Sequence, residues 1–185
     1  MIEVRFHGRG GQGAVTSAEM LALASIEEGR YAQAMPSFGP ERRGAPVAAF
    51  ARIDDHRIRL RIGITTPDIV IVLDPSLVGL AAVQQGLKPG GMVIVNSPED
   101  EAGIRKAMNG YAGRLASVNA TEIALKILRV PITNTSMLGA FAKATGDVRV
   151  ESFVEPLKKR FGKIAARNIE ALKAAHEETR IHEGR

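Results

Sequence analysis

The sequence predicts an α/β protein, a three-layer α/β/α domain with a mixed sheet and a Rossmann-like front half. Residues 2–6 alternate apolar and polar side chains, as a strand does, and a glycine-rich turn then leads into apolar residues at helical spacing. Residues 68–74 and 92–96 are short, nearly continuous apolar runs, which are typical of strands buried on both faces. Helical patterns follow these strands, and this alternation is what a layered α/β sheet requires.

The composition predicts a single domain over residues 1–185, because a chain of this length with 45% hydrophobic residues can build a substantial core. The absence of cysteine excludes disulfides, a catalytic thiol and any cysteine-ligated iron–sulfur cluster on this chain. We see no leader and no apolar run of about 18 residues, so we expect a soluble, cytoplasmic protein without a membrane partner.

The formal net charge of +5 suits an acidic partner or a polyanionic ligand, although a merely solvated basic surface would give the same balance. With 4% aromatic residues and scattered basic side chains, the chain carries no recognition motif for nucleic acid. We therefore expect no nucleic-acid partner.

The candidate binding element is the stretch His7-Gly-Arg-Gly-Gly-Gln-Gly-Ala14, between the first strand and a helix predicted over residues 15–28. Such a turn brings backbone N–H groups to the positive end of the helix, where they accept phosphate or another anion. The glycines could equally serve a tight turn with no ligand. The candidate residues here are Gly8, Arg9, Gly10, Gly11, Gln12 and Gly13.

The glycine spacing also matches the G-x-G-x-x-G pattern of dinucleotide-binding folds. A nicotinamide site would need an acidic residue at the end of the second strand, about 20 residues further on. Here the extended stretch 31–35 runs into Pro36 and carries no such residue. A plain nicotinamide dehydrogenase is therefore disfavoured.

Residues 33–46 are rich in proline and glycine, and we interpret them as a functional loop. Arg42 and Arg43 would lie near the glycine turn, where their planar guanidinium groups suit phosphate or carboxylate. Alternatively, Glu41 pairs with one of these arginines and the cluster has no ligand.

Residues 47–53 and 57–62 are predicted to form a β-hairpin around the polar turn 54–56. In the second strand the arginines at 57, 59 and 61 would form a stripe about 13 Å long. This stripe suits an edge strand that is protected by charge. Alternatively, the arginine stripe docks to an acidic neighbouring subunit.

Asp74 stands at the carboxyl end of the strand predicted over residues 68–74 and is predicted to cap a helix through about Gln85, although ligands also bind at such strand ends. Ser97 is predicted to start the helix that follows the strand over 92–96. Residues 115–118 are predicted to be the last strand.

The remainder of the chain is predicted to be helical, over about 119–128, 136–145, 150–161 and 164–178, with residues 179–185 frayed. Thr135 and Ser136 are further candidates for the exposed chemistry near the glycine turn. The four histidines lack metal-ligand spacing, so we expect no metal site. No motif supplies a nucleophile with a base, and we assign no catalytic residue.

Four blocks of the sequence resemble the gamma subunit of the 2-oxoacid:ferredoxin oxidoreductases, most closely the pyruvate type (pyruvate synthase). They occur in order over nearly the whole chain, which is far more specific than a single glycine motif. The blocks are residues 7–14, 38–46, 67–74 (Pro67-Asp68 with Val72-Leu-Asp74) and 134–140 (Asn-Thr-Ser-Met-Leu-Gly-Ala).

This resemblance implies a subunit of a complex that converts a 2-oxoacid and coenzyme A reversibly into acyl-CoA, CO2 and reduced ferredoxin. It implies alpha, beta and delta partner subunits, with thiamine diphosphate between alpha and beta and iron–sulfur clusters on beta and delta. The gamma-type domain is associated with coenzyme A, and the chain would not be active alone. Pyruvate is the preferred substrate, with 2-oxoisovalerate and 2-oxoglutarate as alternatives.

The residues and the resemblance together suggest that the amides of Gly10–Gly13 and the side chains of Arg9, Arg42 and Arg43 bind the phosphates of coenzyme A. Two other functions stay open. One is a purely structural subunit whose glycine turn and arginines hold a companion chain. The other is a stand-alone nucleotide-binding oxidoreductase.

Overall fold

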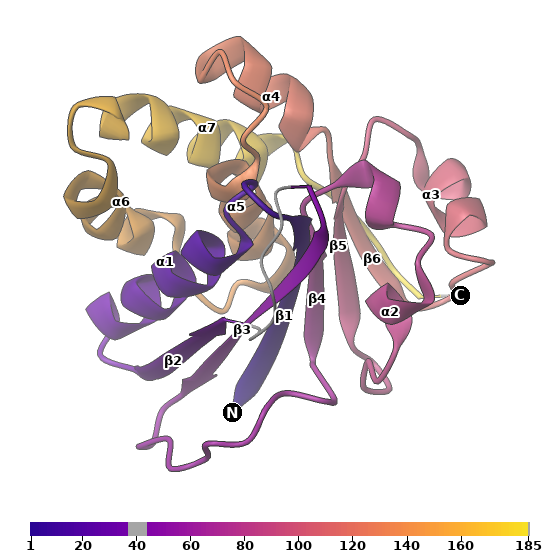
Figure 1. Cartoon of the computed structure of the whole chain (residues 1–185), viewed down its shortest axis with the longest axis horizontal. Helices are drawn as coiled ribbons and strands as arrows, with labels where there is room; N and C mark the ends of the chain where they lie inside the picture. Colours follow the sequence, from indigo (N-terminus) through magenta and orange to yellow (C-terminus); the bar gives the residue numbers. More distant parts are fainter. Residues whose placement is uncertain (37–43, 185) are drawn as a thin grey trace.

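The computed structural model describes residues 1–36 and 44–184, which form a seven-stranded sheet flanked by helices (Figure 1). The strands are β1 (Ile2–Arg9), β2 (Tyr31–Pro36), β3 (Pro46–Asp54), β4 (Ile69–Val72), β5 (Met92–Asn96), β6 (Arg114–Val118) and β7 (Arg180–His182). The α-helices are α1 (Ala14–Glu27), α2 (Ala81–Gln84), α3 (Glu101–Ala107), α4 (Ala120–Ile127), α5 (Asn134–Thr145), α6 (Val154–Phe161) and α7 (Ala165–Glu178). Short 3₁₀ turns cover Pro75–Leu77, Val150–Phe153 and Gly162–Ile164.

The sheet is mixed, with strand order β2-β3-β1-β4-β5-β6-β7. Strands β1, β4, β5 and β6 run parallel, so their carboxyl ends meet at one edge of the sheet. β3 pairs antiparallel with both β1 and β2, and β7 pairs antiparallel with β6. The predicted α/β class and mixed sheet are confirmed.

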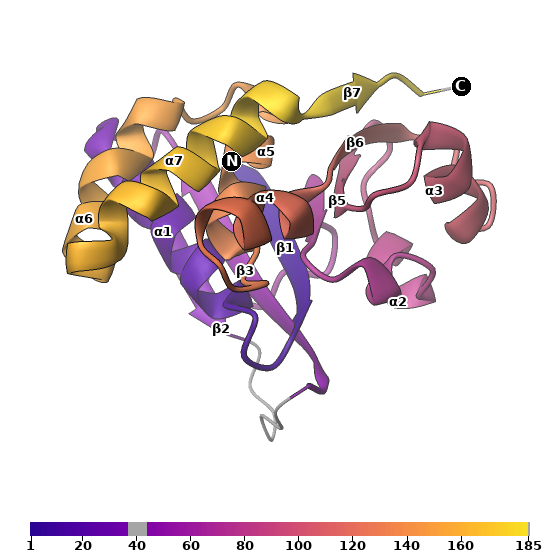
Figure 2. The ribbon, with the colours of Figure 1, turned by 90° about the horizontal axis from the view of Figure 1, so that it is seen from above.

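Two apolar cores lie on opposite faces of this sheet. The larger core packs β1, β3 and one face of the parallel strands against α1, α5 and α7, with Phe6, Leu21 and Phe141 completely buried. The smaller core packs the other face of β4 and β5 against the segment around α2 and against α3. Figure 2 shows these two helical layers from above. Side chains that alternate along β4 and β5 enter different cores, which explains why these strands are apolar throughout.

The predicted hairpin is wrong in its second strand. Residues 47–53 lie in β3, but residues 57–62 have no strand partner among the described residues. β3 is already paired on both edges, with Ala51 opposite Val4 of β1 and Ala34 of β2. The segment after the turn therefore has no free edge of β3 to join.

The predicted frayed end is wrong for residues 180–182, which form β7 beside β6. Ile181 lies opposite Ala116, and β7 covers what would otherwise be an exposed sheet edge. The Arg105 guanidinium also donates to the Glu183 carbonyl at 2.9 Å. A strand this short has too few residues to show a period of two, so the sequence pattern did not reveal it.

Two helices begin or run differently from the prediction. The helix after Asp74 is broken at Gly79, where a Cβ atom would lie 2.9 Å from the Ala107 carbonyl oxygen. The backbone approaches α3 there and helix resumes at Ala81. The next helix starts at Glu101, capped by Asp100, instead of at Ser97. Both residues are good caps, so sequence alone did not distinguish them.

Candidate functional site

The candidate site lies at the carboxyl end of β1, beside the end of β4, which is where open α/β sheets bind their ligands. Gly8 and Arg9 still belong to β1, and α1 begins at Ala14. The turn between them needs glycine at Gly11 and Gly13, which have φ values of +95° and +84°. The glycine turn, residues 9–13, therefore has a conformation that its sequence enforces locally.

Gln12 holds the glycine turn closed. Its side-chain oxygen accepts a hydrogen bond from the Arg9 backbone N–H at 2.7 Å, and its Nε2 donates to Asp74 Oδ2 at 2.5 Å. The Gln12 amide itself donates to the Arg9 carbonyl at 3.0 Å. This one side chain thus ties the end of β1 to Asp74, two residues beyond the end of β4.

The Arg9 side chain extends the same network. Its guanidinium donates to Ser76 Oγ and to the Gly44 carbonyl, and Nε lies 3.5 Å from Asp74 Oδ2. Asp74 also accepts hydrogen bonds from the Ser76 amide and hydroxyl, as the predicted cap requires. Burial alone would raise the pKa of Asp74, but hydrogen bonds from Ser76 and Gln12 and the charge of Arg9 hold it below its ordinary value.

The predicted set of anion-binding amides needs one correction. Gly10 N donates to the Ala45 carbonyl at 2.9 Å, and the Gln12 amide is used as described above, so these two are not available to a ligand. Among the described residues, the amides of Gly11, Gly13, Ala14 and Val15 have no acceptor. Within residues 1–36 and 44–184, no acceptor competes with an anion for these four amides, which lie at the start of a 14-residue helix.

The start of α5 packs against the glycine turn. A Cβ atom on Gly13 would lie 2.7 Å from Asn134 Nδ2, so this position excludes any larger residue on steric grounds as well. Asn134 comes from the fourth sequence block, and the structure explains why that block and the glycine block occur together. Thr133, which precedes it, donates to the Leu73 carbonyl at the end of β4.

The other predicted site residues are placed less favourably for ligand binding. Thr135 is buried and its hydroxyl donates to Asn168 Oδ1 at 2.9 Å. Ser136 is also fully buried, and its hydroxyl has no partner among the described residues. Arg42 and Arg43 lie outside the described residues, so their predicted role stays a prediction.

Sequence reasoning missed the contributions of Ser76 and Asn134 to this site. Ser76 comes shortly after the end of β4, just beyond the third sequence block. Asn134 is the first residue of α5 and of the fourth sequence block. Their contacts with Arg9 and Gly13 join residues more than 60 positions apart, and no local pattern reports such a contact.

The topology also argues against a dinucleotide site of the ordinary type. In that type, the strand after the first helix lies next to the first strand and presents an acidic residue to a ribose. Here β3 is inserted between β1 and β2. β2 is thereby displaced from the glycine turn by one strand.

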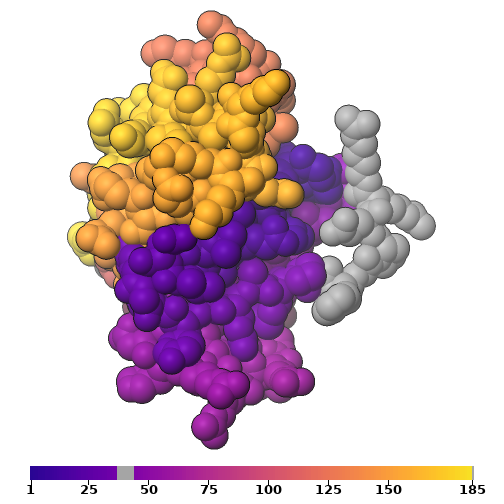
Figure 3. Space-filling model, turned by 90° about the vertical axis from the view of Figure 1, so that its left-hand side faces the viewer, coloured from indigo at the N-terminus to yellow at the C-terminus, as the bar shows by residue number. Residues whose placement is uncertain are grey.

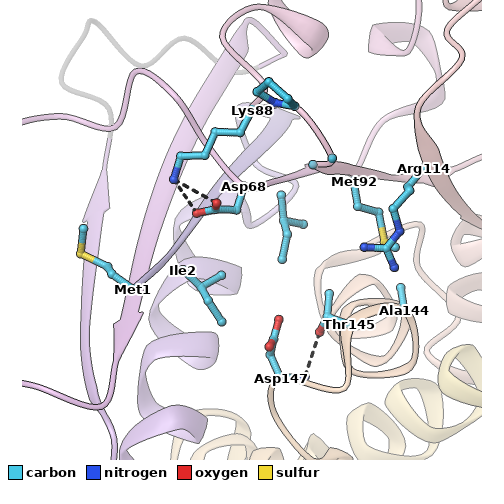
Figure 4. Close-up of a pocket in the computed structure, with 13 residues that line it drawn as sticks. Met1, Ile2, Asp68, Lys88, Met92, Arg114, Ala144, Thr145 and Asp147 are labelled. Atoms are coloured by element: carbon cyan, nitrogen blue, oxygen red, sulfur yellow. Dashed lines mark hydrogen bonds and ion pairs between the residues drawn. The ribbon is translucent and has the colours of Figure 1, made fainter. Parts of the chain in front are cut away.

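A separate cavity of about 360 Å³ lies at the opposite, amino end of the parallel strands (Figure 4). Its charged groups have both signs: Lys88 pairs with Asp68 at 2.9 Å, while Asp147 and Arg114 also line the wall. Burial raises the pKa of Asp147, although Arg30 counteracts this. The mixed charge does not select one class of ligand.

Within residues 1–36 and 44–184, no three histidine or acidic side chains are grouped closely enough to hold a metal ion. Over the same residues, no helix has both the length and the apolar character needed to cross a membrane.

Comparison with known proteins gives consistent matches over nearly the whole chain. The family model described as pyruvate ferredoxin/flavodoxin oxidoreductase matches residues 3–178. The chain is 54% identical to the "Pyruvate/ketoisovalerate oxidoreductases common subunit gamma" of Thermococcus litoralis, over 99% of this chain and 100% of that one. It also resembles the crystal structure of pyruvate oxidoreductase subunit PORC of Thermotoga maritima, with 38% identity, a TM-score of 0.88 and 98% of each chain covered.

A more distant structure shares the fold. The 2-oxoglutarate:ferredoxin oxidoreductase of Magnetococcus marinus, solved with 2-oxoglutarate, coenzyme A and succinyl-CoA bound, matches with a TM-score of 0.73 and 20% identity. The match covers 95% of this chain but 31% of that longer chain.

Proposed function

Because the chain belongs to the pyruvate ferredoxin/flavodoxin oxidoreductase family, as a gamma subunit of a 2-oxoacid:ferredoxin oxidoreductase, we propose that its glycine turn holds coenzyme A for the companion subunits. The observation that carries the proposal is that the amides of Gly11, Gly13, Ala14 and Val15 have no acceptor among the described residues. They lie at the positive end of α1, whose first turn contains no acidic residue.

Coenzyme A is the ligand class that fits best, because it carries a pyrophosphate and a 3′-phosphate. A helix N-terminus with free amides binds such groups. One protein with this fold has been solved with coenzyme A bound, which makes this polyanion the first to test. Arg42 and Arg43 are proposed to add guanidinium donors to the same phosphates.

The chain's own part in the reaction is then binding and orientation. The proposed reaction joins a 2-oxoacid, preferably pyruvate, to coenzyme A with release of CO2 and reduction of ferredoxin. Thiamine diphosphate is proposed to lie between the alpha and beta subunits, and iron–sulfur clusters on beta and delta. The Thermococcus litoralis relative is named as common to pyruvate and ketoisovalerate enzymes, which supports the proposal that the companion subunits choose the 2-oxoacid.

One observation favours a purely structural role instead. The Arg9 guanidinium is used within the domain, on Ser76, Gly44 and Asp74, as a turn that only braces the fold would require. The two functions differ in one consequence: only a binding role makes the affinity for coenzyme A depend on the charge at the turn.

The experiment compares Gly11→Asp with Gly11→Asn in the assembled complex. Both side chains tolerate a positive φ, and no atom lies within 4 Å of the Cβ position at Gly11. A carboxylate there repels a phosphate, so the aspartate variant should raise the KM for coenzyme A by about tenfold. The asparagine variant should stay within about twofold of the wild type.

The KM for the 2-oxoacid serves as an internal control and should be unchanged in both variants. Equal KM values for coenzyme A in the aspartate and asparagine variants would contradict the binding role and leave the structural one. Arg42→Ala and Arg43→Ala, measured in the same assay, test the arginine part of the proposal separately.

A further inference from the structure

Residues 57–62, Arg-Ile-Arg-Leu-Arg-Ile, have the sequence of a β-strand but pair with no strand among the described residues. Apolar and charged side chains alternate without a break, and β-branched residues are frequent. Yet within the described part of the chain, this arginine segment makes no backbone–backbone hydrogen bond. The Ile58 carbonyl accepts a long hydrogen bond from Gln33 Nε2, at 3.4 Å.

The side chains of the arginine segment are largely exposed. Leu60 is 42% exposed and Ile62 is 68% exposed, on the same segment as three exposed arginines. None of Arg57, Arg59 and Arg61 forms an ion pair with a described residue. Arginines elsewhere in the chain do find partners: Arg52 pairs with Glu3 at 2.8 Å, and Arg105 with Glu101 at 2.7 Å.

The two ends of the arginine segment are anchored, so its middle is presented at a defined place. Before it, Asp55 pairs with Arg30 at 3.0 Å. After it, Ile64 is buried, and the Thr65 carbonyl lies so close to Gly86 that a Cβ there would be 2.2 Å away. The segment between β3 and β4 runs along the end of the molecule opposite the glycine turn (Figure 1). In the side view, the chain that follows β3 forms the lower end, away from α6 and α7 (Figure 3).

We propose that the arginine segment pairs as a β-strand with an acidic extended segment of a companion subunit. Pairing with a partner strand would give hydrogen-bond partners to the backbone N–H and C=O groups of the segment. It would also place the arginines on one face of the new strand and the apolar side chains on the other. The three arginines would then follow one another at about 6.6 Å, matching acidic side chains at alternate positions of the partner strand. Leu60 and Ile62 would face the opposite side, against apolar residues of the same partner.

The charges, the backbone groups and the apolar side chains of the segment together favour an acidic protein strand over other acidic partners. A polyanion such as RNA, or an anionic membrane surface, would use the arginine charges but not a row of backbone donors and acceptors. A protein strand uses the charges, the backbone groups and the apolar side chains together. The inference rests on the proposed function in one respect, namely that the chain works inside a complex.

Proline substitutions test the strand pairing. Successive N–H groups of a strand point to opposite edges, so Leu60→Pro and Arg61→Pro remove donors from different edges. Because neither donor forms a backbone hydrogen bond with a described residue, both variants should keep the wild-type melting temperature to within about 3 °C in the isolated chain. In the complex, one of the two should reduce co-purification of the companion subunits about tenfold or more.

Hydrogen–deuterium exchange measures the same pairing without a substitution. The amides of residues 57–62 should exchange quickly in the isolated chain and should become protected in the assembled complex. Protection that is equally weak in both states, together with normal assembly of both proline variants, would overturn the proposal.

Charge reversal tests the acidic partner. The triple variant Arg57→Glu, Arg59→Glu, Arg61→Glu should lose the companions, whereas Lys126→Glu, Lys143→Glu, Lys173→Glu makes the same change in net charge at exposed helical positions and should retain them. If both triple variants assemble normally, the proposal fails. If the arginine variant loses binding to RNA or to anionic lipid vesicles but still assembles, the segment serves that other partner and the proposal fails.

The wild-type chain separates this failure from that of the proposed function. If the wild-type chain purifies from cells without companion subunits, the proposed function itself is contradicted. If it purifies with them and the variants do so equally well, only the arginine segment is wrongly assigned.

Discussion

The glycine turn and the arginine segment both connect elements of secondary structure and both carry arginine, but they differ in the contacts that their arginines make within the domain. Arg9, in the turn, is fixed by Ser76, Gly44 and Asp74. The arginines of the segment have no ion-pair partner among the described residues, and its backbone makes no backbone–backbone hydrogen bond with them. The first connection is therefore fixed by side-chain contacts before any ligand binds, whereas the second is held only at its two ends. A ligand site gains affinity from such preorganisation, and a subunit contact gains its order on assembly.

The two regions should differ most in how much the free energy of unfolding changes when a glycine is replaced by alanine. Gly13→Ala places a side chain at φ +84° and within 2.7 Å of Asn134, so we expect a loss of about 3 kcal/mol in the free energy of unfolding. Gly63→Ala, beside the arginine segment, meets no atom within 4 Å and should change this free energy by less than about 0.5 kcal/mol. Urea denaturation of the isolated chain measures both, and equal losses would refute the contrast.

Removing an acidic side chain should show the same contrast, with a smaller effect. Asp74→Ala leaves Gln12, Ser76 and Arg9 without their acceptor, which should cost about 2 kcal/mol. Asp55→Ala removes an exposed ion pair with Arg30 and should cost less than about 1 kcal/mol.

The loss from Asp74→Ala also depends on pH. The pKa of Asp74 in the folded protein is below its value in the unfolded chain, so its stabilisation is fully present above about pH 4. It disappears as the pH falls through the folded pKa. Below that point the wild type and Asp74→Ala should unfold at more similar urea concentrations, and a constant difference would contradict the role of the charge.

A third comparison is between two histidines, His7 just before the glycine turn and His56 just before the arginine segment. Burial, together with the charge of Arg5, lowers the pKa of His7 to about 4. Between about pH 6.5 and 4 the unfolded chain therefore binds a proton that the folded protein does not, and stability falls as the pH is lowered. His7→Phe should remove about 1–2 kcal/mol of this acid sensitivity, after allowance for partial exposure. His56→Phe, at a side chain that is 93% exposed beside the arginine segment, should change the free energy of unfolding at neutral pH by less than about 0.5 kcal/mol.

The smallest effect is expected in the arginine segment itself. Replacing Arg57, Arg59 and Arg61 by serine in the isolated chain should change the free energy of unfolding by less than about 0.5 kcal/mol, because exposed charges without ion pairs add little. A clear loss in urea denaturation would mean that the segment is bound within its own subunit after all.

Local patterns predicted most elements of the fold. The glycine turn, the apolar strands and the cap at Asp74 all have sequence signals that act over a few residues, and Asp74 indeed accepts the Ser76 amide. The errors have non-local causes. Residues 57–62 have a strand pattern, but β3, the strand before them, has no free edge, whereas residues 180–182 have almost no pattern and a vacant edge beside β6.

The sequence by itself determined the chemistry at the front of the chain. Glycines with positive φ and a helix start imply free amides through backbone geometry alone, wherever the domain places them. The tertiary structure decided which of those amides have no acceptor, because the Ala45 carbonyl accepts the amide of Gly10. It also brought Asn134 against Gly13 from a distant part of the chain. The pairing of strands was decided in the same way. A strand's side chains are set by its own sequence, but its hydrogen bonds need a neighbour, and only the whole fold determines which edges are still open.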